Sequence, residues 1–188
     1  MDRKRVVVGI SGASGAVYGI RLLRLLAQRP EVETHLVVSR AAGLIIDHEV
    51  AETLEEIEAL ADVAYRSDDL AAPIASGSFP ALGMVIAPCS IKTLSAVANS
   101  YAANLIRRAA DVTLKERRPL ILLVRETPLH LGHLRLMAQA TEIGAVVFPP
   151  IPAFYGRPET VEDLIDETLG RVLAHLGLEN TLYTVWEG

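Results

Sequence analysis

The sequence of 188 residues is poor in cysteine, aromatic residues and lysine, and these shortages exclude several classes of protein. Its one cysteine, Cys89, excludes a disulfide framework and a cysteine-rich metal centre. Aromatic residues make up only 5% of the chain and the formal net charge is -5, so we expect no nucleic-acid surface. Because no apolar run is long enough to span a bilayer and no signal peptide is visible, we expect no membrane association and a cytoplasmic location.

Positive charge is scarce over the whole chain but gathered in one region. Of the 18 basic residues, only three are lysines, and seven basic residues lie within 107–135. These seven are Arg107, Arg108, Lys115, Arg117, Arg118, Arg125 and Arg135. A local concentration of cations in an acidic protein favours a pocket for a small anionic ligand. Arg107, Arg117 and Arg118 are interpreted as a solvated helix face.

Continuous apolar runs alternate with helical patterns along the chain. The runs at 5–10, 34–39, 84–89, 119–124 and 144–149, with a weaker one at 62–65, are typical of strands covered on both faces. Helical patterns occupy 15–28, 40–61, 91–98, 104–118, 129–143 and 160–177. This alternation predicts an α/β fold, a doubly wound (Rossmann-like) parallel sheet of about six strands in three layers. We expect a single domain over 1–188, with a C-terminal extension at 178–188.

A glycine-rich turn, GISGASG at 9–15, follows the first predicted strand. Its glycines allow a ligand to approach the backbone, and the amides of the following helix can face an anion. The second strand ends in Ser39 and Arg40, without the acid that a NAD ribose requires, although Arg40 leaves NADP open. A second turn, APCSIKT at 87–93, places Ser90 at the start of another helix. If the strand order is 3-2-1-4-5-6, both turns line one crevice, which favours a mononucleotide.

Several separated motifs occur in order and carry a family resemblance. They are GISGASGAVYGIRLL, ASGSF, PCSIKTLSAVA, RAADVTLKERRPLILLVRETPL and PAFYGRPETVEDL. The sequence resembles the UbiX-type flavin prenyltransferases, which include the small protein partners of phenolic-acid decarboxylases, nearly from end to end. The resemblance implies a metal-independent flavoprotein enzyme that joins a dimethylallyl group from dimethylallyl phosphate to N5 and C6 of reduced FMN. The product, prenylated FMN, would serve a partner decarboxylase of the UbiD type, and the resemblance favours a homo-oligomer of twelve subunits.

The resemblance also implies roles for individual residues. The residues implied to bind FMN are Gly12, Ala13, Ser14, Ser39, Ser90, Ile91, Lys92, Thr93 and Arg125. The residues implied to surround the allylic phosphate are Tyr155, Arg171, Arg108, Lys115 and Glu126. Glu49 matches the acid/base near the flavin, Ser14 lies beside its reactive face, and Glu126 takes up a proton during ring closure. No metal ligands are implied, and the three-residue spacing of His130 and His133 is interpreted as incidental.

Two other functions stay open on the sequence. One is an FMN-dependent decarboxylase, acting either on a cysteine residue or on an aromatic acid. The other is a non-catalytic carrier that binds FMN and hands it on. The cluster of charged residues around a second, phosphate-sized site favours catalysis over carriage, because unneutralised charges are costly to desolvate. The sequence does not decide between a monophosphate and a pyrophosphate donor.

Overall fold

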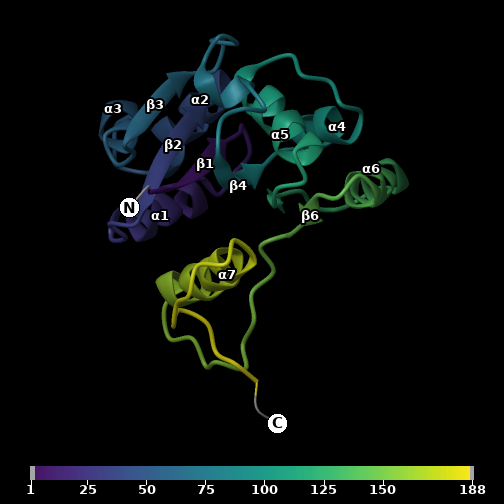
Figure 1. Cartoon of the computed structure of the whole chain (residues 1–188). Helices are drawn as coiled ribbons and strands as arrows, with labels where there is room; N and C mark the ends of the chain where they lie inside the picture. The colour runs from purple at the N-terminus through teal and green to yellow at the C-terminus, as the bar shows by residue number, and fades with distance from the viewer. Residues whose placement is uncertain (1–2, 187–188) are drawn as a thin grey trace. The chain divides into compact units, whose positions relative to one another are not determined.

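The computed structural model describes residues 3–186 (Figure 1). The chain divides into two compact units between Pro149 and Pro150, and each unit is described by itself. The first unit holds every strand of the sheet, and the second holds the last helix with the C-terminal segment. The expectation of one domain over 1–188 stays a prediction.

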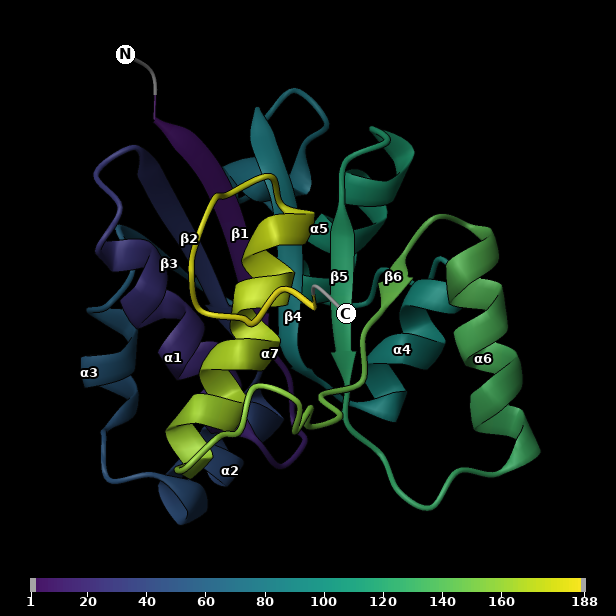
Figure 2. The same cartoon turned by 90° about the horizontal axis from the view of Figure 1, so that it is seen from below.

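The first unit is built on a six-stranded, all-parallel sheet in the order β3-β2-β1-β4-β5-β6 (Figure 2). The predicted α/β, doubly wound fold and the 3-2-1-4-5-6 order are therefore confirmed. The last predicted run, 144–149, pairs over two residues only. The strands are β1 (Lys4–Ile10), β2 (Val32–Val38), β3 (Val63–Arg66), β4 (Ala81–Cys89), β5 (Leu120–Val124) and β6 (Val146–Val147).

Helices cover both faces of this sheet. Helix α1 packs against β1, β2 and β4 on one face, while α4 and α5 cover the other and α6 packs on α4 (Figure 1). Gly19 permits the close approach of α1, because a Cβ there would lie 2.3 Å from the Ala87 carbonyl oxygen. The helical pattern at 40–61 forms two helices rather than one. The helices of this unit are α1 (Ala16–Ala27), α2 (Arg40–Glu49), α3 (Leu54–Glu58), the short 3₁₀ turn η1 (Pro73–Ala75), α4 (Ile91–Ala98), α5 (Leu105–Lys115) and α6 (Leu131–Glu142).

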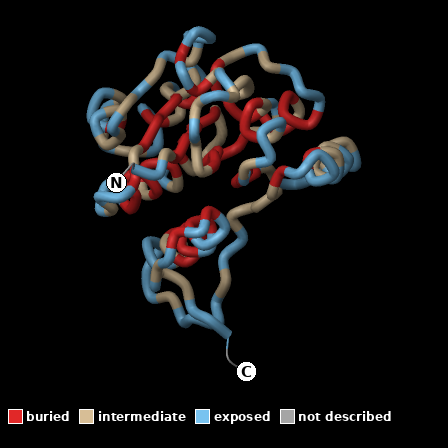
Figure 3. Tube along the Cα trace, viewed as in Figure 1, coloured by how far each residue is buried: buried red, intermediate tan, exposed pale blue. Residues whose placement is uncertain are grey.

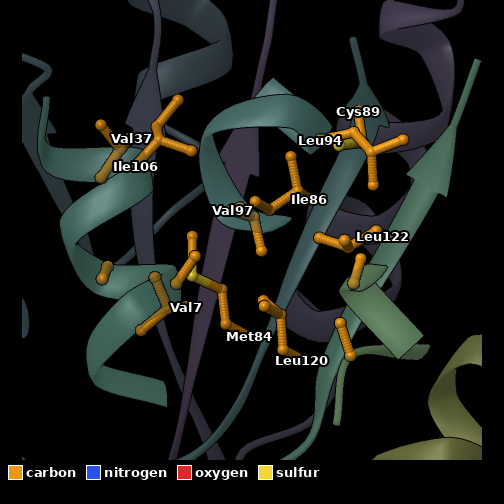
Figure 4. Packing of buried hydrophobic residues seen from close by; sticks show 14 of the residues in the cluster. Val7, Val37, Met84, Ile86, Cys89, Leu94, Val97, Ile106, Leu120 and Leu122 are labelled. Carbon is orange, nitrogen blue, oxygen red and sulfur yellow. The ribbon is translucent and has the colours of Figure 1, made fainter. Parts of the chain in front are cut away.

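The core of the first unit lies between the sheet and the α4–α5 face. Buried residues follow the strands and the inward faces of these helices (Figure 3). Figure 4 shows strand side chains meeting helical ones, and those labelled there include Val7, Met84, Ile86, Leu120, Leu122, Leu94, Val97 and Ile106. Each fully buried aliphatic side chain contributes about 1.5–3 kcal/mol to folding, so this layer holds the strand ends in fixed positions.

The second unit consists of helix α7 (Val161–His175) and a C-terminal segment that folds back along it. The predicted capping box is present: the Thr160 side chain accepts the Asp163 N–H, and the Asp163 side chain accepts the Thr160 N–H. The Asn180 side chain donates to the Gly170 carbonyl at 2.9 Å, and a Cβ on Gly170 would lie 2.9 Å from Leu182 Cβ. The segment therefore needs glycine at position 170 in order to lie this close to the helix.

Among residues 3–186, no helix is long and apolar enough to cross a membrane.

Candidate functional site

The turns after β1 and β4 are joined by one buried serine. The Ser11 hydroxyl donates to the Pro88 carbonyl at 2.9 Å and accepts the Ser90 N–H at 2.8 Å. The Ser11 N–H also donates to Pro88. Strands β1 and β4 are neighbours in register, so these bonds fasten the two turns side by side at the carboxyl edge of the sheet. The predicted single crevice between the turns is thus present.

Two helices begin at this edge with serine caps. The Ser39 side chain accepts the Ala42 N–H at the start of α2, and the Ser90 side chain accepts the Thr93 N–H at the start of α4. The Ser39 N–H donates to the carbonyl of Ile10, which ties the α2 cap to the end of β1. The first N–H groups of a helix have no acceptor inside it, so α2 and α4 both present donors toward this edge.

The amides at the start of α1 are held by a carboxylate of the chain itself. One oxygen of Glu49, Oε2, accepts the N–H of Gly15 at 2.8 Å and of Ala16 at 3.1 Å. Gly15 has a φ of 98°, in the left-handed region that favours glycine, and this conformation turns the chain into α1. The anion expected at this helix start is therefore Glu49, which leaves α2 and α4 for a ligand.

These contacts set the charge of Glu49. Partial burial raises the pKa of its carboxyl group, but hydrogen bonds from Ser14, Gly15 and Ala16, together with the charge of Arg125, outweigh it. The pKa of Glu49 is therefore below its ordinary value, and the group is ionised at neutral pH. The structure thus brings together three predicted site residues, Ser14, Glu49 and Arg125.

Arg125 and Glu126 follow β5 at the same edge of the sheet. The Arg125 N–H donates to the Cys89 carbonyl at 3.0 Å, which places the arginine backbone beside the β4 turn. The Glu126 side chain accepts the Thr127 N–H at 3.0 Å. Both predicted residues thus stand where a ligand of a doubly wound sheet binds.

Cys89 and the two neighbouring histidines do not form a reactive centre. Complete burial raises the pKa of the Cys89 thiol, so the thiolate is not available as a nucleophile. His130 caps α6 through its own ring nitrogen, which accepts the N–H groups of Gly132 and His133. Within residues 3–186, no group of three or more histidine, cysteine, aspartate or glutamate side chains is arranged to hold a metal ion.

The α5 cations predicted to contact phosphate have protein partners instead. Arg108 donates to the Ala75 carbonyl at 3.1 Å and pairs with Asp111, while Lys115 pairs with Glu116. Seven residues separate Arg108 from Lys115, about 10 Å along the helix. None of the described contacts of these two side chains reaches the Ser14–Glu49–Arg125 group. Their role at the phosphate stays a prediction.

Arg118 is not part of a solvated helix face, contrary to the sequence interpretation. Helix α5 ends at Lys115, and the Arg118 guanidinium donates to the carbonyls of Gly77 and Phe79. With Arg108, it binds the backbone of the irregular segment between β3 and β4. The sequence gives no signal for this contact, because carbonyl acceptors are common to all residues.

Tyr155 and Arg171 lie in the second unit. The Tyr155 hydroxyl donates to the Thr184 carbonyl at 3.4 Å, and its ring meets Trp186 edge-on with centroids 5.9 Å apart. Arg171 is exposed on α7 and lines a shallow hollow with Ala174, His175 and Tyr183. Their part in one site with the first unit stays a prediction.

This fold with its paired turns is the architecture of a mononucleotide-binding flavoprotein, and the Flavoprotein family model matches residues 1–173. The flavin prenyltransferase UbiX of Escherichia coli K12 is 58% identical over 187 residues, which cover 98% of this chain and 99% of that protein. The crystal structure of AnUbiX (PadA1) in complex with FMN and dimethylallyl pyrophosphate has a TM-score of 0.95 at 48% identity, with 99% and 98% of the two chains covered.

A dodecameric FMN-dependent UbiX-like decarboxylase from Escherichia coli O157:H7 has a TM-score of 0.94 at 44% identity, over 98% of this chain and all of the other. The chain belongs to the UbiX-type flavin prenyltransferase family.

Proposed function

We propose that this protein joins a dimethylallyl group to N5 and C6 of reduced FMN and releases prenylated FMN. The observation that carries the proposal is the pair of serine-capped turns fastened by Ser11, with an ionised Glu49 and a cationic Arg125 beside them. Membership of the UbiX-type family supports FMN as the flavin.

The residues at this edge fit a flavin mononucleotide chemically. The starts of α2 and α4 supply N–H donors, Ser39, Ser90 and Thr93 supply hydroxyl groups, and Lys92 and Arg125 supply positive charge. A phosphate dianion is favoured by such a donor set. The close packing of Gly12 on α2 points the same way, because a Cβ there would lie 2.5 Å from Ala41 Cβ and would push α2 away from the turn.

In the proposed reaction, reduced FMN supplies the two nucleophilic atoms, N5 and C6, that replace the phosphate on the allyl group. Glu49 is held as a carboxylate by Ser14 and the α1 amides, so it is ready to accept a proton and later return it. Ser14 fixes the position of that carboxylate beside the flavin. Glu126, at the end of β5, is proposed to take up a proton as the ring closes.

The departing phosphate is proposed to be stabilised by Arg108, Lys115, Tyr155 and Arg171. Breaking the allylic C–O bond moves negative charge onto the phosphate, and fixed cations stabilise such charge without a metal ion. We propose a monophosphate donor, because the predicted cation set is compact. The complex of AnUbiX with dimethylallyl pyrophosphate supports an allylic phosphate as the second substrate.

We also propose that the prenylated flavin passes to a decarboxylase of the UbiD type and that the protein works as a homo-oligomer of twelve subunits. The dodecameric E. coli O157:H7 relative supports the assembly. Sedimentation velocity on the purified protein tests the number of subunits.

The reaction is tested anaerobically with reduced FMN and dimethylallyl phosphate. Mass spectrometry should find a flavin heavier by one isoprenoid unit, and inorganic phosphate should appear in equal amount. Unchanged flavin that stays bound would indicate an FMN carrier. Carbon dioxide released from an added aromatic acid, with no prenylated flavin formed, would indicate a decarboxylase.

A further inference from the structure

A hollow of about 350 Å³ lies in the first unit between α4 and the first turn of α5. Its lining consists of Lys92, Ser95, Ala96, Asn99, Tyr101 and Arg107. Two of these residues are cations and none is acidic. The volume is near the lower end of the range found for small-molecule sites, so the hollow suits a compact ligand.

The Arg107 side chain has an unused donor at this hollow. Its Nε atom is buried and has no hydrogen-bond partner within residues 3–186. The backbone N–H of Arg107 donates to the Asn104 side chain, which caps α5, but that bond does not involve the guanidinium. A buried donor without a partner costs about 1–3 kcal/mol, so a bound acceptor would recover this energy.

Lys92 brings a second positive charge to the same hollow. It lies on the first turn of α4 and is exposed. Within the described residues, neither Lys92 nor Arg107 forms an ion pair. Two like charges that share one hollow repel each other, and an anion between them converts that repulsion into attraction.

The remaining lining residues indicate which anion fits. Tyr101, with 66% of its surface exposed, offers an aromatic wall, and Ser95 adds a hydroxyl group. Asn99 is already engaged, because its Nδ2 donates to the Ser95 carbonyl at 2.7 Å. A guanidinium fork and an ammonium group together match a phosphate group better than a single carboxylate, since phosphate offers more acceptor oxygens.

We propose that this hollow is a second phosphate-binding site, separate from the FMN cradle, which takes orthophosphate or the phosphate group of a small alkyl phosphate. Lys92 is shared with the predicted FMN residues, so the site adjoins the flavin. The proposal deepens the proposed function, because prenyl transfer consumes an alkyl phosphate and releases orthophosphate. Binding to the hollow itself does not require that reaction to occur.

The test is isothermal titration calorimetry of the full chain loaded with oxidised FMN, so that no turnover occurs. An Arg171→Leu background disables the predicted allylic-phosphate site. In this background, orthophosphate is expected to bind, and adding Arg107→Leu should weaken binding about tenfold or more, because a charge-assisted contact is lost. The affinity for FMN should not change.

Arg135→Leu is the matched control, because it removes the same charge from a position on α6 outside the hollow. Arg107→Lys keeps the charge without the fork and should give intermediate affinity. Dimethylallyl phosphate in a parallel titration identifies the natural source: tighter binding than orthophosphate indicates the substrate, and equal or weaker binding indicates the released product. Either result supports the site.

Three results would overturn the proposal: no orthophosphate binding at millimolar concentration, equal weakening by Arg107→Leu and Arg135→Leu, or weakened FMN binding in Arg107→Leu. The third result would assign Arg107 to the flavin site. Mass spectrometry of the wild-type reaction is read separately, so a failure of prenyl transfer and a failure of this site are distinguishable.

Discussion

The Glu49 carboxylate, at the end of α2, accepts the backbone N–H of Gly15 at the start of α1 with a distance of 2.8 Å. One side chain therefore closes the end of one helix onto the start of another. The same carboxylate is the predicted acid/base, so its structural and chemical roles can be separated by a change that keeps its shape.

Glu49→Gln should leave FMN binding intact and lower kcat on the order of a hundredfold or more, because an amide accepts the α1 hydrogen bonds but cannot accept a proton. The unfolding free energy should fall by about 0.3–1 kcal/mol, since a negative charge is lost from a helix N-terminus. FMN titration, steady-state turnover and urea unfolding measure the three effects. Normal turnover would remove Glu49 from the mechanism.

The Glu49 contact should also make stability depend on pH. Because the pKa of Glu49 is lower in the fold than in the unfolded chain, its stabilisation is present above the unfolded pKa, about 4.3. It is lost as pH falls through the lower folded value. The difference in unfolding free energy between wild type and Glu49→Gln should therefore shrink in acid, and a constant difference would contradict this account.

Ser11→Ala should lower stability by about 1–3 kcal/mol, because it leaves the Ser90 N–H and the Pro88 carbonyl without their shared partner. FMN affinity should fall as well, since the two turns are no longer fastened. Ser76→Ala is the control, because the Ser76 hydroxyl bonds to Ser78 on an exposed loop. Similar losses in both variants would show that the Ser11 bridge has no special role.

Two glycine substitutions near α2 should have opposite effects. Gly12→Ala forces a Cβ to within 2.5 Å of Ala41 Cβ, so α2 must move and FMN affinity should fall. Gly43→Ala places its Cβ in open space on α2 and should stabilise the helix by up to about 1 kcal/mol. Thermal unfolding and FMN titration of the pair check this, and an unchanged affinity in Gly12→Ala would refute the close-packing argument.

His35 provides a second test of pH dependence, away from the flavin site. Burial lowers its pKa, and the opposing contact with Glu33 does not compensate. Arg5, which bonds to Glu33, and Tyr65, which bonds to the His35 ring, complete the surroundings. The unfolded chain thus takes up a proton at higher pH than the fold does, so stability should fall from about pH 7 to pH 5.5. His35→Gln should flatten that slope.

The sequence predicts the sheet well, for a physical reason. Strands of a parallel sheet are covered on both faces, so they are continuous apolar runs and stand out from amphipathic helices. All six predicted strands are present, although β6 is short. The capping box at Thr160 is equally local and is also confirmed.

The contacts that assemble the site could not be predicted in the same way. Ser11 lies 77 residues from its Pro88 partner, and Arg118 bonds to carbonyls 39 and 41 residues away. Such pairs depend on how the crossovers place the strand ends, which no local pattern encodes. Glu49 matched a family position, but its hold on the α1 amides is visible only in three dimensions.

The arginine contacts to the segment before β4 have a consequence for how that segment can change. Arg108 and Arg118 recognise the oxygens of Ala75, Gly77 and Phe79, which every amino acid carries. The segment is therefore splinted through its main chain and owes little of its shape to its own side chains. Its surface positions are free to be rewritten, for instance to carry a reporter or to suit another protein, while its path stays the same.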